Sequence, residues 1–141
     1  MVYAVRNVMS KPLITVDVEA IVKDAIKLMI ERNIGTLVVT EEGEPVGIIT
    51  ERDILRNCCL DAYLNFKVRD IMSKSLVTVD CETSIGQASE IMTEKKIRRL
   101  LVTEKNKITE EEKIVGIVTQ RDLMRAILDV IHSLRSLSLS D

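Results

Sequence analysis

The sequence predicts an α/β (α+β) fold made of two copies of one β-α-β-β-α unit. The main observation is an internal repeat, in which residues 5–17 recur as residues 68–80. The offset of 63 holds without a gap to Thr40 and Thr103, and it then becomes 69 because the second copy has a turn six residues longer. With 141 residues, of which 46% are hydrophobic, the chain can bury a core. Two repeats of about 60 residues should pack face to face, since neither has a generous core alone.

The first repeat shows the pattern of each element in turn. Leu13–Val16 is typical of a short strand, and residues 20–32 carry apolar side chains at helical spacing. The β-branched stretch Thr36–Thr40 and the stretch 45–49 flank a polar turn, which predicts a hairpin. A second helix is predicted from Arg52 to about Cys59.

The second repeat has the same order of elements. A capping box at Ser84 opens a helix that is predicted to continue through Lys96. The hairpin strands are expected at Arg99–Thr103 and Ile114–Val118, with a solvated, charged turn over residues 104–113 between them. The final helix is predicted from Gln120 to about Leu134.

These elements divide the chain into a first repeat over residues 5–64 and a second repeat over residues 68–131. The remaining tail, residues 132–141, is expected to fray beyond Arg135. The alternative is that a subunit contact recruits the tail.

Composition excludes several classes of protein. The net charge of −2 and the pI near 5.6 disfavour nucleic acid as a partner. The chain has no apolar run of the roughly 20 residues that a membrane helix needs. The first six residues lack the apolar segment of a signal peptide, so we expect a cytoplasmic protein.

The inventory of reactive side chains argues against an enzyme. The three cysteines, Cys58, Cys59 and Cys81, match neither a disulfide framework nor a zinc spacing. His132 is the only histidine, which disfavours Ser-His-Asp catalysis and a multi-histidine metal site. We therefore expect no catalytic residues, no metal and no required cofactor.

Each repeat ends in the pattern Gly-x-x-Thr-x-Arg-Asp, where a strand turns directly into a helix. In the first copy, Thr50, Arg52 and Asp53 place a hydroxyl, a cation and a carboxylate around a helix N-terminus, which favours an anionic guest. A carboxylate there can also accept hydrogen bonds from two neighbouring sugar hydroxyls, so the combination suits a nucleotide. The alternative stays open, because Thr-x-x-Asp is close to a helix capping box and capping alone explains both residue types.

Taken together, the repeat resembles the CBS domain, named after cystathionine β-synthase. It begins near Met9-Ser10 and Met72-Ser73 and closes on the doubled motif, and the match covers roughly residues 5–131. The tandem arrangement resembles a CBS pair, or Bateman module, and leaves nothing over for a catalytic domain.

The resemblance implies that the repeats pack through their hairpin strands with pseudo-two-fold symmetry and leave two clefts between them. It further implies a regulatory module that binds AMP, ADP, ATP or S-adenosylmethionine, forms a homodimer and signals to a separate, unidentified protein. The alternative is a structural or dimerisation module whose clefts are empty.

The resemblance also assigns roles to individual residues. The ribose contacts are Thr50, Asp53, Thr119 and Asp122; the phosphate contacts are Arg52, Arg121, Arg98 and Arg99; the contacts to the base are Ile14, Thr15, Val77 and Thr78. Gly35-Thr36 stand at the positions of Arg98-Arg99, so two sites would be chemically unequal.

Overall fold

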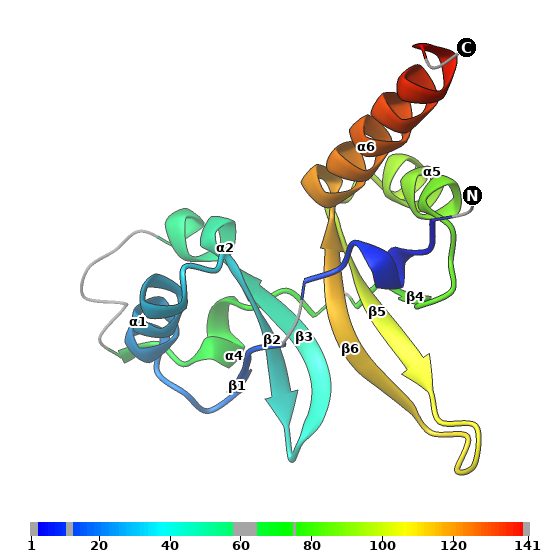
Figure 1. Cartoon of the computed structure of the whole chain (residues 1–141). Helices are drawn as coiled ribbons and strands as arrows, with labels where there is room; N and C mark the ends of the chain where they lie inside the picture. The colour runs from blue at the N-terminus through cyan, green and yellow to red at the C-terminus, as the bar shows by residue number, and fades with distance from the viewer. Residues whose placement is uncertain (1–2, 11–12, 58–64, 75, 140–141) are drawn as a thin grey trace. The chain divides into compact units, whose positions relative to one another are not determined.

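The computed structural model describes residues 3–10, 13–57, 65–74 and 76–139, and these form two compact units. Unit 1 comprises residues 1–12 and 77–141, and unit 2 comprises residues 13–76. Each unit contains a three-stranded sheet with helices (Figure 1). The mixed α+β architecture predicted from the repeat is therefore confirmed.

Unit 2 holds the sheet β1-β2-β3. Strand β1 pairs in parallel with β2, and β2 pairs antiparallel with β3 in the predicted hairpin. The elements of unit 2 are β1 (Thr15–Asp17), α1 (Val22–Arg32), β2 (Thr36–Glu41), β3 (Glu44–Thr50), α2 (Glu51–Arg56) and α4 (Val68–Ile71).

Unit 1 repeats this arrangement with the sheet β4-β5-β6. Its elements are the 3₁₀ helix η1 (Val5–Asn7), β4 (Thr78–Asp80), α5 (Ile85–Lys95), β5 (Arg99–Lys105), β6 (Glu112–Thr119) and α6 (Gln120–Leu139). The predicted capping box at the start of α5 is present, because Ser84 Oγ accepts the backbone N–H of Gln87 at 3.1 Å.

The compact units do not coincide with the sequence repeats 5–64 and 68–131. Helix α4 opens the second repeat but packs in unit 2, where Val68 and Ile71 join the core. Helix η1 opens the first repeat but packs in unit 1, where Val5 is fully buried. Each buried side chain of this kind stabilises its unit by roughly 1.5–3 kcal/mol. Each unit is thus completed by a segment of the other repeat.

The glycine of the closing motif makes room for this exchanged segment. Backbone hydrogen bonds of 2.9 Å in both directions join Ile48 to Ser73, just after α4. A Cβ atom on Gly47 would overlap the carbonyl oxygen of Ser73. In unit 1, a Cβ on Gly116 would lie 2.6 Å from Met9 Sδ and 3.1 Å from the Ser10 carbonyl oxygen. The close approach at Gly47 is thus made by backbone, whereas the nearest atoms at Gly116 belong to the side chain of Met9.

Ion pairs on the surface hold the same segments. In unit 2, Glu19 accepts hydrogen bonds from Lys67 Nζ at 2.5 Å and from Arg69 Nε at 2.9 Å. The hydrogen bond from Lys67, followed by the one from Arg69, lowers the pKa of Glu19. The Glu19 carboxylate in turn raises the pKa of Arg69. The equivalent pair in unit 1 joins Arg6 to Glu82.

Two boundaries differ from the sequence prediction, and a third cannot be compared with it. The turn expected over residues 104–113 is shorter, because opposite charges pair across the strands at Glu104↔Lys113 and Lys105↔Glu112 and extend the hairpin. Helix α6 continues to Leu139 instead of ending near Leu134, since no Gly or Pro follows Gly116. Helix α2 is described to Arg56, and its predicted end at Cys59, with Cys58, lies outside the described residues.

Cys81, the one cysteine that the described ranges include, is a buried free thiol in the core of unit 1. Its sulfur accepts a hydrogen bond from Arg6 Nη2 at 3.0 Å. Cys81 therefore serves as a small core side chain of unit 1.

Gly47→Ala should destabilise the protein by about 1–3 kcal/mol, because the new methyl group must displace the backbone of Ser73. Gly116→Ala is the matched control and should cost less, since the nearest atoms belong to the flexible side chain of Met9. Urea unfolding followed by circular dichroism measures both. Equal losses in the two variants would contradict this account of the motif glycine.

Glu19→Gln should lower stability at neutral pH and have little effect in acid. A carboxylate whose pKa is lowered in the folded state contributes fully above its unfolded pKa of about 4.3, and the contribution is lost as the pH falls through the folded pKa. Urea midpoints of the wild type and the variant should therefore differ at pH 7 and converge towards pH 3. The control is Glu31→Gln, a carboxylate for which the structure describes no ion pair; a gap of constant size for Glu19→Gln would refute the linkage.

Candidate functional site

Every residue that the sequence assigned to ligand binding lies at the equivalent end of the sheet in its own unit. In unit 2, Thr36 pairs with Thr50, and Val38 N–H donates to the carbonyl of Ile14 at 3.0 Å. The starts of β1 and β2 and the end of β3 therefore meet. The same pairing in unit 1 joins Arg99 to Thr119, and Leu101 N–H donates to Val77 at 3.0 Å.

The structure thus divides the predicted residues into two sets. The set in unit 2 is Ile14, Thr15, Thr50, Arg52 and Asp53, and the set in unit 1 is Val77, Thr78, Arg98, Arg99, Thr119, Arg121 and Asp122. Each set is brought together within its own unit.

In unit 2 the motif forms a closed capping box. The Asp53 Oδ2 atom accepts the backbone N–H of Thr50 at 2.9 Å and its hydroxyl at 3.1 Å, and Asp53 N–H donates to Thr50 Oγ1 at 3.2 Å. The other carboxylate oxygen, Oδ1, accepts the hydroxyl of Ser73 at 3.1 Å. Thr50 and Asp53 are both buried. The capping interpretation is therefore fully satisfied here.

In unit 1 the same two residue types, Thr119 and Asp122, form a cap with fewer hydrogen bonds. Asp122 Oδ2 accepts the backbone N–H of Thr119 at 2.9 Å, and Asp122 N–H donates to Thr119 Oγ1 at 3.1 Å. The Oδ1 atom lies 3.8 Å from Nη1 of Arg125, whose side chain is largely exposed. One carboxylate oxygen of Asp122 is therefore not committed to the cap.

The charge around the two motifs also differs. In unit 1, Arg98 and Arg121 are exposed, Arg99 is half-buried, and the carbonyl of Arg98 accepts the N–H of Gln120 at 2.9 Å. Three arginines thus surround the first turn of α6.

In unit 2 the first residue of the helix after the motif is the acid Glu51, where unit 1 has Gln120. The N–H of Glu51 donates to the carbonyl of Gly35 at 3.1 Å, and a Cβ on Gly35 would overlap the carboxylate of Glu51. Exposed Arg52 follows at once in the sequence. Unit 1 is the more cationic of the two.

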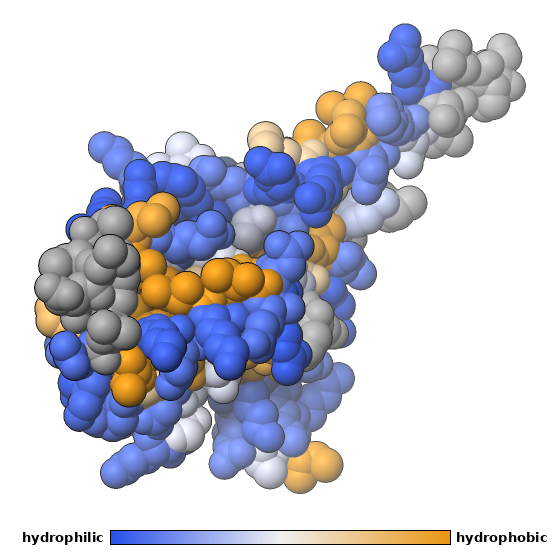
Figure 2. Space-filling model, turned by 90° about the vertical axis from the view of Figure 1, so that its left-hand side faces the viewer, coloured by the Kyte–Doolittle hydropathy of each residue, from blue (hydrophilic) through white to orange (hydrophobic). Residues whose placement is uncertain are grey.

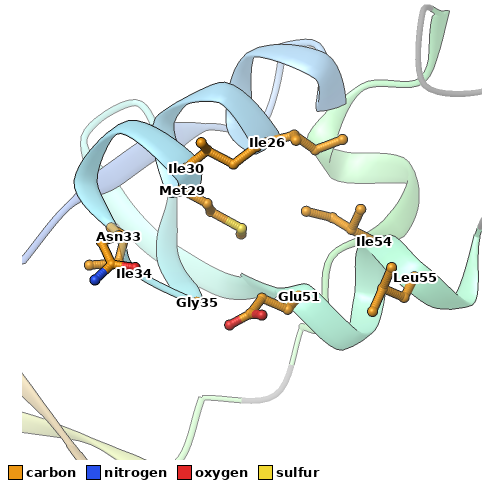
Figure 3. A pocket seen from close by; sticks show the side chains of 9 residues that line it. All are labelled: Ile26, Met29, Ile30, Asn33, Ile34, Gly35, Glu51, Ile54 and Leu55. Carbon is orange, nitrogen blue, oxygen red and sulfur yellow. The ribbon is translucent and has the colours of Figure 1, made fainter.

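A groove between α1 and α2 was not predicted from the sequence. It has a volume of about 470 Å³. Figure 3 shows aliphatic side chains of the two helices facing one another across it, with Glu51 at one end. Its lining residues are Ile26, Met29, Ile30, Asn33, Ile34, Gly35, Glu51, Ile54 and Leu55.

The groove forms part of an apolar band on this face of unit 2 (Figure 2). Ile30 and Leu55 are 75% and 70% exposed, which is unusual for such large apolar side chains. The signal in the sequence was the pair Ile26 and Ile30, four residues apart and off the face that the helix buries.

Among the described residues there is no group of three or more His, Cys, Asp or Glu side chains that could hold a metal ion. Within the same ranges, no helix is long and apolar enough to cross a membrane.

Known proteins share both the sequence pattern and the fold. The CBS domain model matches residues 5–59 and again residues 68–129. "CBS domain-containing protein CBSX3, mitochondrial" from Arabidopsis thaliana is 37% identical over 114 residues, which are 76% of this chain and 52% of that protein. The chain spans about half the length of the first curated relatives that it matches.

Two solved structures bear on the site. The CBS domain pair of protein MJ0100 in complex with 5′-methylthioadenosine and S-adenosyl-L-methionine is 26% identical, with a TM-score of 0.74, and the match covers 90% of this chain and 97% of that one. The hexameric CBS-CP12 protein from bloom-forming cyanobacteria is 28% identical, with a TM-score of 0.73, over 88% of this chain and 67% of that one. With two matched segments that span most of its length, the chain belongs to the CBS domain family and is a tandem CBS pair.

Proposed function

We propose that this protein is a regulatory module that binds an adenosine-containing ligand, namely AMP, ADP, ATP or S-adenosylmethionine. The observation that carries the proposal is the doubled Thr-x-x-Asp motif at the ends of two equivalent sheets, with arginines beside it. The complex of MJ0100 with two adenosine compounds supports the same class of ligand.

The chemistry of the motif fits a nucleotide. A carboxylate oxygen outside the cap, such as Asp122 Oδ1, can accept a hydrogen bond from a ribose hydroxyl. Arg98, Arg99 and Arg121 supply guanidinium groups that pair well with phosphate oxygens. Half-buried Val77 offers an aliphatic surface to a flat base, with exposed Thr78 beside it; Ile14 and Thr15 occupy the equivalent positions in unit 2. Arg52 is the corresponding cation there.

Ligand occupancy would regulate a separate protein partner, and no enzymatic activity is proposed. Such signalling requires that the ligand binds two conformations of the module with different affinities.

The competing function is a structural module without a ligand. The closed capping box at Asp53 favours it, because both oxygens of that carboxylate accept hydrogen bonds from within the protein. The two functions differ in what an added nucleotide does: a structural module shows no heat of binding and no rise in melting temperature.

Isothermal titration with AMP, ADP, ATP and S-adenosylmethionine tests the proposal directly. We expect saturable binding of at least one compound, and Asp122→Ala should weaken it about tenfold or more, as the loss of a hydrogen bond to a charged group worth about 1.5–3 kcal/mol predicts.

Asp129→Ala, in the same helix but beyond its first turn, is the matched control and should bind as the wild type does. Full affinity in folded Asp122→Ala would remove this residue from the site. Silence across the panel would favour the structural module.

We also propose that the protein forms a homodimer through α6. The inner face of this helix buries Leu123 and Ala126 in unit 1. Its outer face exposes Met124, Ile127, Ile131 and Leu134, each between 46% and 62%. The 3-4-3 spacing is that of a seam between paired helices, and a second copy would supply the identical seam by two-fold symmetry. The hexameric CBS-CP12 neighbour supports self-association in general.

Ile131→Glu should convert the dimer into a monomer, because it places a charge in the centre of the seam. Sedimentation velocity measures the change. His132→Glu is the control, since it introduces the same charge at the adjacent exposed position off the seam. A wild type that sediments as a monomer at every concentration would contradict the proposal.

A further inference from the structure

Asp53 does more than cap a helix, because it also holds a segment distant in the sequence. Its Oδ1 atom accepts the hydroxyl proton of Ser73 at 3.1 Å, across 20 residues. Ser73 follows α4, the segment that the second repeat contributes to unit 2. The side chain of Asp53 therefore links the end of β3, the start of α2 and the exchanged segment.

The position of Ser73 is fixed independently of this bond. Its N–H and carbonyl both pair with the backbone of Ile48 at 2.9 Å, and Gly47 leaves the space that its carbonyl fills. The backbone of Ser73 is therefore held in place, and it keeps the serine hydroxyl next to the buried carboxylate of Asp53.

Unit 1 provides an internal comparison. Ser10 occupies the position equivalent to Ser73 and pairs with the backbone of Ile117 at 2.8 and 3.4 Å. Ser10 is nevertheless exposed, and no hydrogen bond joins its side chain to Asp122, although both residues are described. The second carboxylate oxygen of Asp122 lies instead 3.8 Å from Nη1 of Arg125.

We propose that Asp53 is a structural clasp for the exchanged segment, and that of the two Thr-x-x-Asp motifs only Thr119–Asp122 receives a ligand. The second half rests on the proposed function above. A ribose hydroxyl at Asp53 has to compete with Ser73 Oγ for Oδ1 on a residue that is only 8% exposed, and displacing the serine would leave its hydroxyl without this partner. A hydroxyl at Asp122 displaces no hydrogen bond of the cap.

The surroundings point in the same direction. The motif in unit 1 opens a helix of 20 residues and is flanked by Arg98, Arg99 and Arg121, all of which favour an anionic ligand. The motif in unit 2 opens a helix of six residues whose first residue is the acid Glu51. The motif in unit 1 is therefore better matched in charge to an anionic ligand.

The clasp is tested first without any ligand. Ser73→Ala should lower the melting temperature, whereas Ser10→Ala, the matched change in the other unit, should leave it within experimental error. Asp53→Ala should likewise be more destabilising than Asp122→Ala. Equal effects within either pair would overturn the clasp; Ser73→Ala removes a single hydroxyl, so this comparison holds even if Asp53→Ala does not fold.

The single site is tested by titration of AMP, or of S-adenosylmethionine if AMP does not bind. We expect one equivalent per chain, with a Kd that changes less than twofold in Ser73→Ala and rises tenfold or more in Asp122→Ala. Two equivalents in the wild type, or binding that is lost in Ser73→Ala and kept in Asp122→Ala, would overturn the assignment. If neither compound binds, ADP and ATP are titrated in the same way; silence of all four would refute the proposed function instead, and the melting temperatures would then decide the clasp alone.

Discussion

The exchange of N-terminal segments is the constraint on which the rest of this fold depends. A repeat of about 60 residues buries too little surface for a stable core of its own. Here Val5 completes the core of unit 1 and Val68 that of unit 2, so each repeat supplies apolar surface that the other lacks. The hydrogen bonds from Val5 N–H to Thr83 and from Val68 N–H to Ala20, both 2.8 Å, fix the two segments in equivalent registers. Unit 1 is therefore built from two separate stretches of chain, and unit 2 contains parts of both sequence repeats.

This constraint explains why the closing motif contains the residues that it does. The glycine accommodates the exchanged segment, the threonine and aspartate cap the following helix, and in unit 2 the aspartate also binds that segment. Most of the motif therefore serves folding. In unit 1 the Oδ1 atom of Asp122 takes no part in the cap and lies 3.8 Å from Nη1 of Arg125, which is why the proposed ligand is assigned to that motif.

Most of the fold could be predicted from the sequence, because hydrophobic period and capping act locally. The pattern that predicted a helix after Ser84 is realised by a bond from the N–H of Gln87. The exchange could not be predicted in this way, since residues 5–9 and 68–72 have nearly the same sequence and either core would accept either segment. The length of the β5–β6 turn depended on cross-strand pairs such as Glu104↔Lys113, which are defined only once the register is known.

The candidate site, like the fold, could be predicted from the sequence only in part. The sequence identified Thr50–Asp53 and Thr119–Asp122 and assigned them one role, and it indicated inequality only through Gly35-Thr36 opposite Arg98-Arg99. The structure locates the larger difference elsewhere, in a serine that bonds to Asp53 in one unit and is exposed in the other. The two copies of the motif therefore differ in the contacts of Ser73 and its equivalent, Ser10, although both positions carry a serine. In the proposed arrangement, the Thr50–Asp53 motif holds unit 2 together whether or not a ligand occupies the Thr119–Asp122 motif. Folding and ligand binding then depend on different motifs, which gives the module a physical basis for regulation.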